Sequence, residues 1–496
     1  MRKTQARQAR HARSEGEAYF DVIIVGAGLS GIGAAHHLQA RRRSKTYAIL
    51  ESRQEIGGTW DLFRYPGIRS DSDMYTLGYG FRPWTGAKAI ADGASIRAYI
   101  QDTARERGIE QHIRFGHKVL RAAWSSADAV WSVEVERADG SLVVFSCSFL
   151  FACTGYYDYA SGHLPDFPGR ERFAGQLIHA QHWPDDLSYA DKRVVVIGSG
   201  ATAMTLVPAL ARHAAQVTML QRTPTYVVSR PARDDLADRL RNVLPAMLAY
   251  RLIRWRNILA GIYFFNIARK RPQSVRQRIL EGIRAHLGPD FDIATHFAPP
   301  YDPWDQRLCL VPDGDLFDAL NSGKATVVTD HIETFTSEGI QLRSGNRLDA
   351  DLIVAATGLR LQLLGGVELS LDGRPLNLSQ AMTYRGCLYS DVPNFAFCFG
   401  YTNASWTLKC DLTCDYVCRL LNLMDQRGYT SVTPRRRDLS LAEEPMLDFS
   451  SGYVQRAIAR FPKQGSKPPW KMHQNYVFDL LALRYGTLND GALDFQ

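Results

Sequence analysis

A glycine-rich turn directly after a short apolar run constrains the fold of this chain more than any other feature. Residues 21–25 (DVIIV) have the composition of a buried strand, and Gly26, Gly28 and Gly31 follow before helix-forming residues that extend to Ala40. In a strand-turn-helix unit the first glycine permits the tight turn, the second lets a pyrophosphate approach the backbone, and the third allows close packing of the helix on the strand. The sequence therefore predicts a dinucleotide-binding fold here.

An acidic residue after the next expected strand indicates which dinucleotide this fold binds. Residues 47–50 form a second apolar run that ends in Glu51, twenty residues beyond Gly31. A carboxylate at this distance accepts hydrogen bonds from the hydroxyls of a bound ribose. Because a carboxylate repels a 2′-phosphate, Glu51 favours FAD or NAD as the ligand.

The same device recurs in the middle of the chain with a different residue after its second strand. Residues 193–197 (RVVVI) lead into Gly198, Gly200 and Ala203, which form a GxGxxA pattern with alanine at the packing position. The strand expected next is followed by Arg222 instead of an acid, and arginine contacts a 2′-phosphate through charge-assisted hydrogen bonds. This second fold is predicted to bind NADPH; the alternative, that Arg222 is a solvated surface charge, remains open.

Two dinucleotide-binding folds in one chain of 496 residues, one suited to FAD and one to NADPH, indicate an α/β flavoprotein that is reduced by NADPH. Runs at 149–155 and 351–358 both end in Thr-Gly and are expected to carry the chain between the folds, and a β-hairpin is expected at 131–149 with its turn at Asp139-Gly140. We predict two Rossmann-like domains: an FAD-binding domain of residues 18–160 and 381–496, an NADPH-binding domain of residues 161–230 and 300–380, and a helical insertion in the latter at 231–299.

The positive charge is concentrated in two segments of the chain. Residues 1–17 carry five basic against two acidic residues, and residues 241–287 carry ten against one, within a formal net charge of +8. No zinc-finger, RNP or basic-zipper signature accompanies them, so we expect no nucleic-acid partner. Residues 1–17 are expected to form a disordered basic arm.

The basic segment 241–287 has an apolar helical face. Twelve uncharged residues separate Arg256 from Arg269, too few to span a bilayer. Three interpretations are open: the face packs on the protein, it lies peripherally on an anionic membrane, or it contacts a partner. No secretory signal is visible, and the expected location is the cytoplasm, with peripheral membrane association under the second interpretation. The apolar residues of this face are Ile253, Ile258, Ile262, Phe265 and Ile267.

The eight cysteines contain no CxxC pair, which argues against a disulfide scaffold, a zinc ribbon and a redox dithiol. Cys410, Cys414 and Cys418 recur at every fourth residue and so share one helical face. Because no histidine accompanies them at metal-ligand spacing, we expect small core residues and no metal site.

A fixed pattern ahead of the second glycine turn resembles a known family. Residues 173–184 (FAGQLIHAQHWP) match FxGxxxHxxxWP, the fingerprint of Baeyer-Villiger monooxygenases within the class B flavin monooxygenases. Residues 57–75, 301–317 and 400–409 are similar to the ethionamide-activating branch of that family. The resemblance covers nearly the whole chain after about residue 18.

The resemblance implies site residues that the glycine patterns alone do not provide. Arg307 takes the position of the family's active-site arginine, and Asp71 that of the carboxylate that orients it. The implied FAD site consists of Gly26, Gly28, Ser30, Gly31, Glu51, Thr59, Trp60, Asp71 and Val119. The implied NADPH site consists of Gly198, Ser199, Gly200, Ala201, Thr202, Ala203, Met204, Arg222 and Thr223.

The resemblance also implies a reaction. Such enzymes insert one oxygen atom from O2 beside a ketone carbonyl through a C4a-peroxide of reduced flavin, giving an ester or lactone, and we expect oxygenation of sulfides or thioamides as well. A permanently charged arginine would stabilise the peroxyanion and the later oxyanion. Three alternatives stay open: a heteroatom monooxygenase with little ketone activity, an NADPH oxidase, and a membrane-associated redox sensor.

Two further residues carry expectations of their own. His179 lies in the fingerprint, in the linker to the second fold, and is expected to position domains instead of catalysing. Gln306 stands where many family members carry a lysine that helps to hold the 2′-phosphate. This departure leaves Arg222 as the main expected source of a preference for NADPH.

Overall fold

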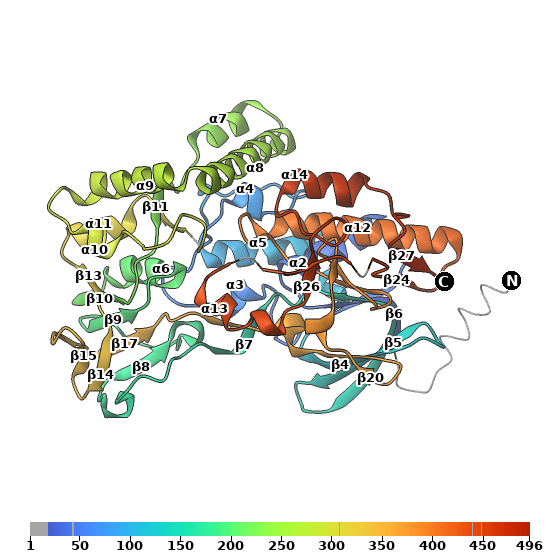
Figure 1. The fold of residues 1–496 in the computed structure, drawn as a ribbon, viewed down its shortest axis with the longest axis horizontal. Helices are drawn as coiled ribbons and strands as arrows, with labels where there is room; N and C mark the ends of the chain where they lie inside the picture. The colour runs from blue at the N-terminus through green and yellow to red at the C-terminus, as the bar shows by residue number, and fades with distance from the viewer. Residues whose placement is uncertain (1–17, 42–43, 307, 439, 448) are drawn as a thin grey trace.

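The computed structural model describes residues 18–41, 44–306, 308–438, 440–447 and 449–496, and the expected basic arm 1–17 and Arg307 lie outside these ranges. Two β-sheets of different size lie next to each other, with helices over both (Figure 1). The strands carry the short apolar runs expected from the sequence, and the helices follow the two glycine turns.

The larger sheet has nine strands in the order β20-β19-β4-β5-β6-β1-β2-β3, with β23 beside β6. Its bounds are β1 (Ala18–Val25), β2 (Tyr47–Leu50), β3 (Ile113–Arg114), β4 (His117–Ser125), β5 (Val130–Arg137), β6 (Leu142–Ala152), β19 (Glu368–Leu371), β20 (Arg374–Pro375) and β23 (Phe395–Phe397). Strand β1 is parallel to β2 and β6, whereas β5 and β6 form an antiparallel hairpin. Gly140 turns this hairpin with φ of 81°, which confirms the expected hairpin.

The smaller sheet is entirely parallel, in the order β13-β10-β9-β17-β8. Its strands are β8 (Gln176–His179), β9 (Arg193–Ile197), β10 (Gln216–Gln221), β13 (Ala325–Thr329) and β17 (Leu352–Ala355). Val194, Val195 and Val196 of its central strand are at most 1% exposed. A parallel sheet with such a continuous apolar run must be covered on both faces, and helix α6 (Ala201–Leu210) packs against β9 and β10.

The chain passes between the two sheets at the two Thr-Gly steps. After the first step it forms β7 (Tyr157–Gly162), and after the second it forms β18 (Leu359–Leu361), and these two strands pair with each other antiparallel. Strand β19 then joins β4 of the larger sheet, so the chain returns to that sheet before residue 381, where the sequence placed the boundary.

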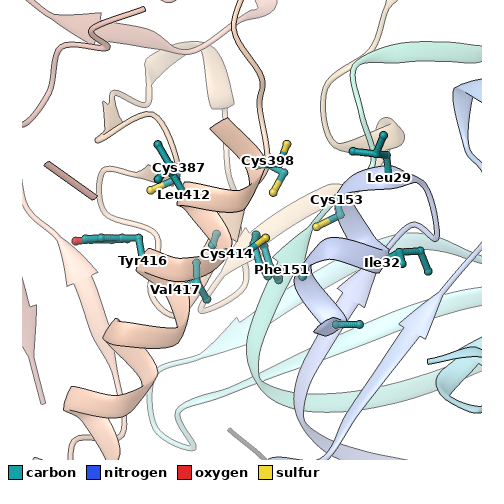
Figure 2. Close-up of a cluster of buried hydrophobic side chains, with 14 of the residues drawn as sticks. Leu29, Ile32, Phe151, Cys153, Cys387, Cys398, Leu412, Cys414, Tyr416 and Val417 are labelled. Carbon is teal, nitrogen blue, oxygen red and sulfur yellow. The ribbon is translucent and has the colours of Figure 1, made fainter. Parts of the chain in front are cut away.

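The main core lies between helix α2 (Leu29–Arg41) and helix α12 (Trp406–Arg427). Cys410, Cys414 and Cys418 are all at most 2% exposed within it, which confirms the expectation that they are core residues. Figure 2 shows Cys153, Cys398 and Cys414 between these two helices. No cluster of three or more His, Cys, Asp or Glu side chains suited to a metal ion occurs among the described residues.

Four helices occupy the expected insertion: α7 (Asp235–Val243), α8 (Ala246–Lys270), α9 (Pro272–Leu287) and α10 (Ile293–His296). Figure 1 shows α7, α8 and α9 along one edge of the molecule. The apolar face expected from the sequence turns toward the protein, because Ile253 and Ile258 are buried and Ile262 packs beside Tyr401. Of the helices in the described ranges, none has the length and hydropathy needed to cross a bilayer.

The remaining elements surround this framework. The helices are α3 (Thr59–Leu62), α4 (Met74–Leu77), α5 (Gly93–Glu106), α11 (Asp315–Asn321), α13 (Gly452–Gln455) and α14 (Tyr476–Asp479). The strands are β11 (Val227–Arg230), β12 (Cys309–Pro312), β14 (Ile332–Thr336), β15 (Gly339–Leu342), β16 (Arg347–Asp349), β21 (Thr383–Tyr384), β22 (Leu388–Tyr389), β24 (Val432–Pro434), β25 (Glu443–Pro445), β26 (Lys463–Gly465) and β27 (Leu493–Phe495).

The packing role of Gly31 gives a prediction about stability. A Cβ atom at Gly31 would lie 1.9 Å from the Gly26 carbonyl oxygen, so Gly31→Ala forces the helix away from the turn. We expect a loss of about 1–3 kcal/mol in the free energy of unfolding, measured by urea denaturation. Gly282→Ala on α9, where no atom lies within 4 Å of the new Cβ, is the matched control and should lose nothing. Equal stability of the two variants would contradict the packing role.

Candidate functional site

A cavity of about 2180 Å³ lies between the two sheets, and both glycine turns open into it. Its other walls come from the segment 57–73, helix α8, and the C-terminal stretches 401–408 and 473–478. Parallel strands point their carboxyl ends, and the turns that follow them, at one edge of a sheet. In this structure both sheets turn that edge toward the same cavity, so the two predicted phosphate-binding turns lie on its wall.

The first turn is held by the acid that follows β2. The Glu51 carboxylate accepts hydrogen bonds from the backbone N–H groups of Ala27, at 2.7 Å, and Arg53, at 2.8 Å. Glu51 is only 4% exposed, yet it lines the cavity. Farther along the same turn, Ser30 Oγ accepts a hydrogen bond of 2.8 Å from Trp406 Nε1, which ties the turn to α12.

The second turn is held in a similar way but ends in a cation. Gly198 has φ of 141°, and a Cβ there would lie 2.3 Å from the Ala356 carbonyl oxygen. Ser199 Oγ donates a hydrogen bond of 2.8 Å to the carbonyl of Thr223, beyond β10. Arg222 is exposed, lines the cavity and forms no ion pair with any described residue. An anion in the cavity can therefore reach its guanidinium.

An acid lies beside this arginine. Strands β10 and β13 are in register at Gln221 and Thr329, so Arg222 and Asp330 are the next residues along the same sheet edge. The Asp330 backbone N–H donates to the Gln221 carbonyl at 2.9 Å, and Asp330 also lines the cavity. The second turn is thus not purely cationic.

Both turns have the features that a dinucleotide phosphate requires. Neither α2 nor α6 carries an acid in its first turn, and no side chain caps α6. A Cβ at Gly200 would meet no atom within 4 Å, so no contact within the protein requires glycine there. Helix N-termini with free N–H groups attract phosphate. The residues present therefore fit the phosphates of FAD and NADPH.

Most of the predicted site residues line this cavity, and a few do not. Gly31, Ala203 and Met204 lie behind the turns: Gly31 packs against Gly26, and the other two are at most 1% exposed in the core. Arg307 is outside the described residues, although its neighbours Gln306 and Leu308 line the cavity. The lining residues are Gly26, Gly28, Ser30, Glu51, Thr59, Trp60, Asp71, Val119, Gly198, Ser199, Gly200, Ala201, Thr202, Arg222 and Thr223.

The segment 57–73 connects the two halves of the site. Arg69 forms an ion pair with Asp315 at the start of α11, with Nη2 3.2 Å from Oδ1. Burial raises the pKa of Tyr65 to about 12, and a hydrogen bond with Thr202 of the second turn opposes that shift. Asp71, two residues beyond Arg69, lies on the cavity wall. Sequence reasoning picked out this segment by resemblance but assigned no role to Arg69 or Tyr65.

Two buried polar atoms of cavity-lining residues have no hydrogen-bond partner within the described part of the chain. They are Trp304 Nε1 and Asn403 Oδ1. A buried donor or acceptor without a partner costs free energy, so each is available to a ligand. Both lie in segments whose family resemblance was noted, but no single-residue signal marked them in the sequence.

His179 lies at the end of β8, away from the cavity. Its Nδ1 accepts a hydrogen bond from the Gln181 N–H at 3.1 Å, and its Nε2 faces the Gly358 carbonyl at 3.2 Å. Acceptance at Nδ1 places the proton on Nε2, which donates to Gly358. Burial lowers the pKa of His179 below its ordinary value, so the ring is neutral at pH 7. A neutral imidazole that is hydrogen-bonded to Gly358, where the chain leaves the smaller sheet, favours the positioning role.

Comparison with known proteins places this site in a family. The model for flavin-binding monooxygenase-like proteins matches residues 90–257, and that for an NAD(P)-binding Rossmann-like domain matches residues 24–92. FAD-containing monooxygenase EthA of Mycobacterium tuberculosis is 53% identical over 478 residues, which cover 96% of this chain and 98% of that protein. The chain belongs to the FAD-containing monooxygenases. A probable FAD-binding monooxygenase, AlmA of Acinetobacter baylyi, is 50% identical over 482 residues, covering 97% of each chain.

Solved structures confirm the predicted fold of this FAD-containing monooxygenase. An oxidized steroid monooxygenase bound to NADP superposes with a TM-score of 0.76 at 22% identity, covering 96% of this chain and 99% of the other. Cyclohexanone monooxygenase from Rhodococcus sp. Phi1, bound to NADP+, superposes with a TM-score of 0.74 at 21% identity, covering 97% and 99%. The α/β architecture with two dinucleotide-binding folds is therefore shared.

The depressed pKa of His179 predicts a pH-dependent contribution to stability. A histidine whose pKa is lowered by folding stabilises the protein above its ordinary pKa, and this contribution is lost as the pH falls through that value. We expect His179→Ala to cost about 1–2 kcal/mol in the free energy of unfolding at about pH 8 and clearly less at about pH 5.5, by urea denaturation. A difference between the two proteins that stays constant or grows on acidification would contradict this role.

Proposed function

We propose that this FAD-containing monooxygenase uses NADPH and O2 to insert one oxygen atom beside the carbonyl of a ketone, giving an ester or lactone, and also oxygenates sulfides or thioamides. The observation that supports this most strongly is the pair of glycine turns that open on one cavity, with an acid at the ribose position of one and an arginine at that of the other. The names of the superposed steroid and cyclohexanone monooxygenases support a ketone substrate.

The two turns would bind the two cofactors through their backbones. Gly28 and the N-terminus of α2 would receive the FAD pyrophosphate, with Glu51 at the adenosine ribose. Gly200 and the N-terminus of α6 would receive the NADPH pyrophosphate, and Arg222 would pair with the 2′-phosphate. When bound, FAD supplies oxygen activation and NADPH supplies the hydride.

Arg307 and Asp71 are the proposed catalytic residues. Arg307 lies in sequence between two cavity-lining residues, and Asp71 lines the cavity itself. An arginine remains charged at every working pH, so it can stabilise negative charge that develops on oxygen without giving up its proton. Asp71 would orient the guanidinium and partly neutralise it.

Aromatic side chains on the cavity wall would keep water from the reacting atoms. Tyr156 stacks on Trp406 with ring centroids 5.1 Å apart, and both line the cavity. Phe399 packs beside both rings, at 5.2 and 5.4 Å. Excluding water protects reactive oxygen intermediates from side reactions, which is what separates an oxygenase from an oxidase.

Product analysis separates this proposal from its rivals. The holoenzyme is incubated with NADPH and a panel of linear, cyclic and aryl ketones beside a thioether, and products are identified by mass spectrometry. Esters or lactones are the expected result. Sulfoxide without any ester would favour a heteroatom monooxygenase, and hydrogen peroxide without any oxygenated product would favour an oxidase or a redox sensor.

Arg222 should set the preference between the two nicotinamide cofactors. Arg222→Ala removes the proposed 2′-phosphate contact, so binding of NADPH should weaken by about 1–3 kcal/mol and its KM should rise accordingly. The KM for NADH should stay nearly unchanged. Steady-state kinetics with each cofactor measure this. Arg230→Ala, at another arginine of the cavity wall, is the matched control. Equal effects of Arg222→Ala on both cofactors would remove the assignment.

Arg307 should affect oxygenation more than reduction. We expect Arg307→Ala to leave NADPH-dependent reduction of the flavin intact, measured by stopped-flow absorbance, and to abolish ester formation, because the oxyanion loses its cation. Arg307→Lys keeps a charge and should retain part of the activity. Undiminished ketone oxygenation by Arg307→Ala would refute its role.

A further inference from the structure

Exposed large apolar side chains gather on one face of the described structure. Ten of the twelve lie on α7, α8 and the C-terminal segment 476–485, which contains α14, and only Leu142 and Tyr429 lie elsewhere. Contiguous exposed apolar surface of this kind marks a site of contact with another apolar body. We call the ten residues the outer apolar face: Leu236 and Val243 of α7, Leu248, Leu252, Trp255, Leu259 and Tyr263 of α8, and Phe478, Leu481 and Tyr485 of the C-terminal segment.

The α8 residues of this face form a straight stripe. At 3.6 residues per turn, their spacing places all five within an arc of about 80°. They point away from Ile253 and Ile258, which pack on the protein, so α8 is apolar on two sides. The ring of Trp255 contacts that of Tyr476 at 5.7 Å, which joins the stripe to the C-terminal segment. Figure 1 shows α7, α8 and α14 along the same edge of the molecule.

Basic residues accompany the stripe. Arg251 is exposed within its length, and Lys270 and Arg271 are exposed where α8 ends. The segment 241–287 carries ten basic residues and a single acid. Four of the ten pair with acids outside the segment, and the remaining six still give it an excess of positive charge. An apolar helix face with basic residues around it is the pattern of helices that lie in the interface of an anionic lipid bilayer.

The same charge argues against a second copy of the chain as the occupant. In a two-fold dimer each surface meets itself, so two copies of the basic segment would be brought together. Like charges at such short range repel, whereas an anionic lipid surface neutralises them. Since α8 is too polar to cross a bilayer, it would lie along the surface.

The cavity opens at the edge of this face. Phe478 is 56% exposed, belongs to the outer apolar face and lines the cavity. Ala260 and Gly261 of α8 are likewise exposed and line it. Ile258 and Ile262, which flank the stripe on α8, line the cavity and pack beside Tyr401. An apolar molecule at the outer apolar face can therefore enter the cavity beside the Phe478 side chain.

We propose that the outer apolar face docks on an anionic lipid surface, and that apolar substrate dissolved in the lipid enters the cavity beside Phe478. The docking step is independent of the proposed function, whereas the entry step rests on it. The substrate class is an apolar ketone or sulfide that partitions into membranes.

Vesicle flotation tests the docking step. The holoenzyme is mixed with phosphatidylcholine vesicles that contain about one third phosphatidylglycerol, and with vesicles of phosphatidylcholine alone. We expect binding to the anionic vesicles that weakens as salt is raised, and much weaker binding to the neutral ones. Replacing the stripe, Leu252→Ser/Leu259→Ser/Tyr263→Ser, should reduce binding to the anionic vesicles at least about tenfold.

The two exposed apolar residues elsewhere provide the matched control. Leu142→Ser/Tyr429→Ser removes exposed Leu and Tyr side chains outside the outer apolar face and should bind as the wild type does. Arg251→Gln/Lys270→Gln should lose about fivefold per charge. Bound FAD and thermal unfolding confirm that each variant is folded. Docking is overturned if the stripe variant and the control bind the vesicles equally. It is also overturned if the wild type binds no vesicles but is a dimer in solution, and the stripe variant is a monomer.

Turnover tests the entry step separately. The stripe variant should oxidise a short water-soluble ketone at the wild-type rate, because none of its three positions lines the cavity. Its rate on a long apolar ketone supplied in anionic vesicles should fall in proportion to lost binding. If the stripe variant matched the wild-type rate on the long ketone as well as on the short one, entry from the lipid would be overturned. Vesicle binding without oxidation of either ketone would overturn the proposed function and leave the docking intact.

Discussion

The architecture follows from the need to bring the carboxyl ends of the parallel strands of two sheets to one cavity. Each edge ends in a turn so close to its neighbours that only glycine fits, at Gly31 above the Gly26 carbonyl and at Gly198 above the Ala356 carbonyl. Each turn is thereby fixed on its own sheet, so the distance between the two turns depends on how the two sheets are held together. The pairing of β7 with β18, the His179 contact to Gly358 and the ion pair between Arg69 and Asp315 provide that relation.

Helix α8 completes the enclosure, and a buried charge holds one of its ends. The Arg254 guanidinium is 6% exposed as a residue and donates 2.7 Å hydrogen bonds to the carbonyls of Tyr75 and Gly78. It also donates to the Tyr250 hydroxyl at 3.3 Å and forms an ion pair with Asp411 at 3.6 Å. A buried charge is tolerated only when it is hydrogen-bonded in this way. The other half of α8 contacts Trp304 through Phe265, at 5.5 Å, so the helix spans the cavity from one side to the other.

Local patterns made much of this predictable from the sequence. A strand, a glycine turn and a helix are contiguous in the chain, so Gly26, Gly28, Gly198 and Gly200 could be placed without knowledge of the rest. The hairpin with its Gly140 turn and the core cysteines of α12 followed from equally local rules. Glu51 and Arg222 needed only the additional knowledge that they follow the next strand.

What could not be predicted depends on contacts between distant segments. No local signal indicates that β19 joins β4, or that Arg69 reaches Asp315 at the start of α11. The period of α8 revealed one apolar face but not which side would meet the protein, and the outer stripe was missed because α8 is apolar on two sides. Gln306, noted as a departure from the family's lysine, lines the cavity, and its effect on cofactor preference stays a prediction.

The most direct test of the central claim follows the oxygen atom itself. The holoenzyme is incubated with NADPH, an apolar ketone and isotopically labelled dioxygen, and the label in the product is measured by mass spectrometry beside the NADPH consumed. The account predicts one labelled atom in each ester formed and close to one NADPH oxidised per ester. Oxidation of NADPH with all of the label recovered as hydrogen peroxide, and none in an organic product, would contradict it.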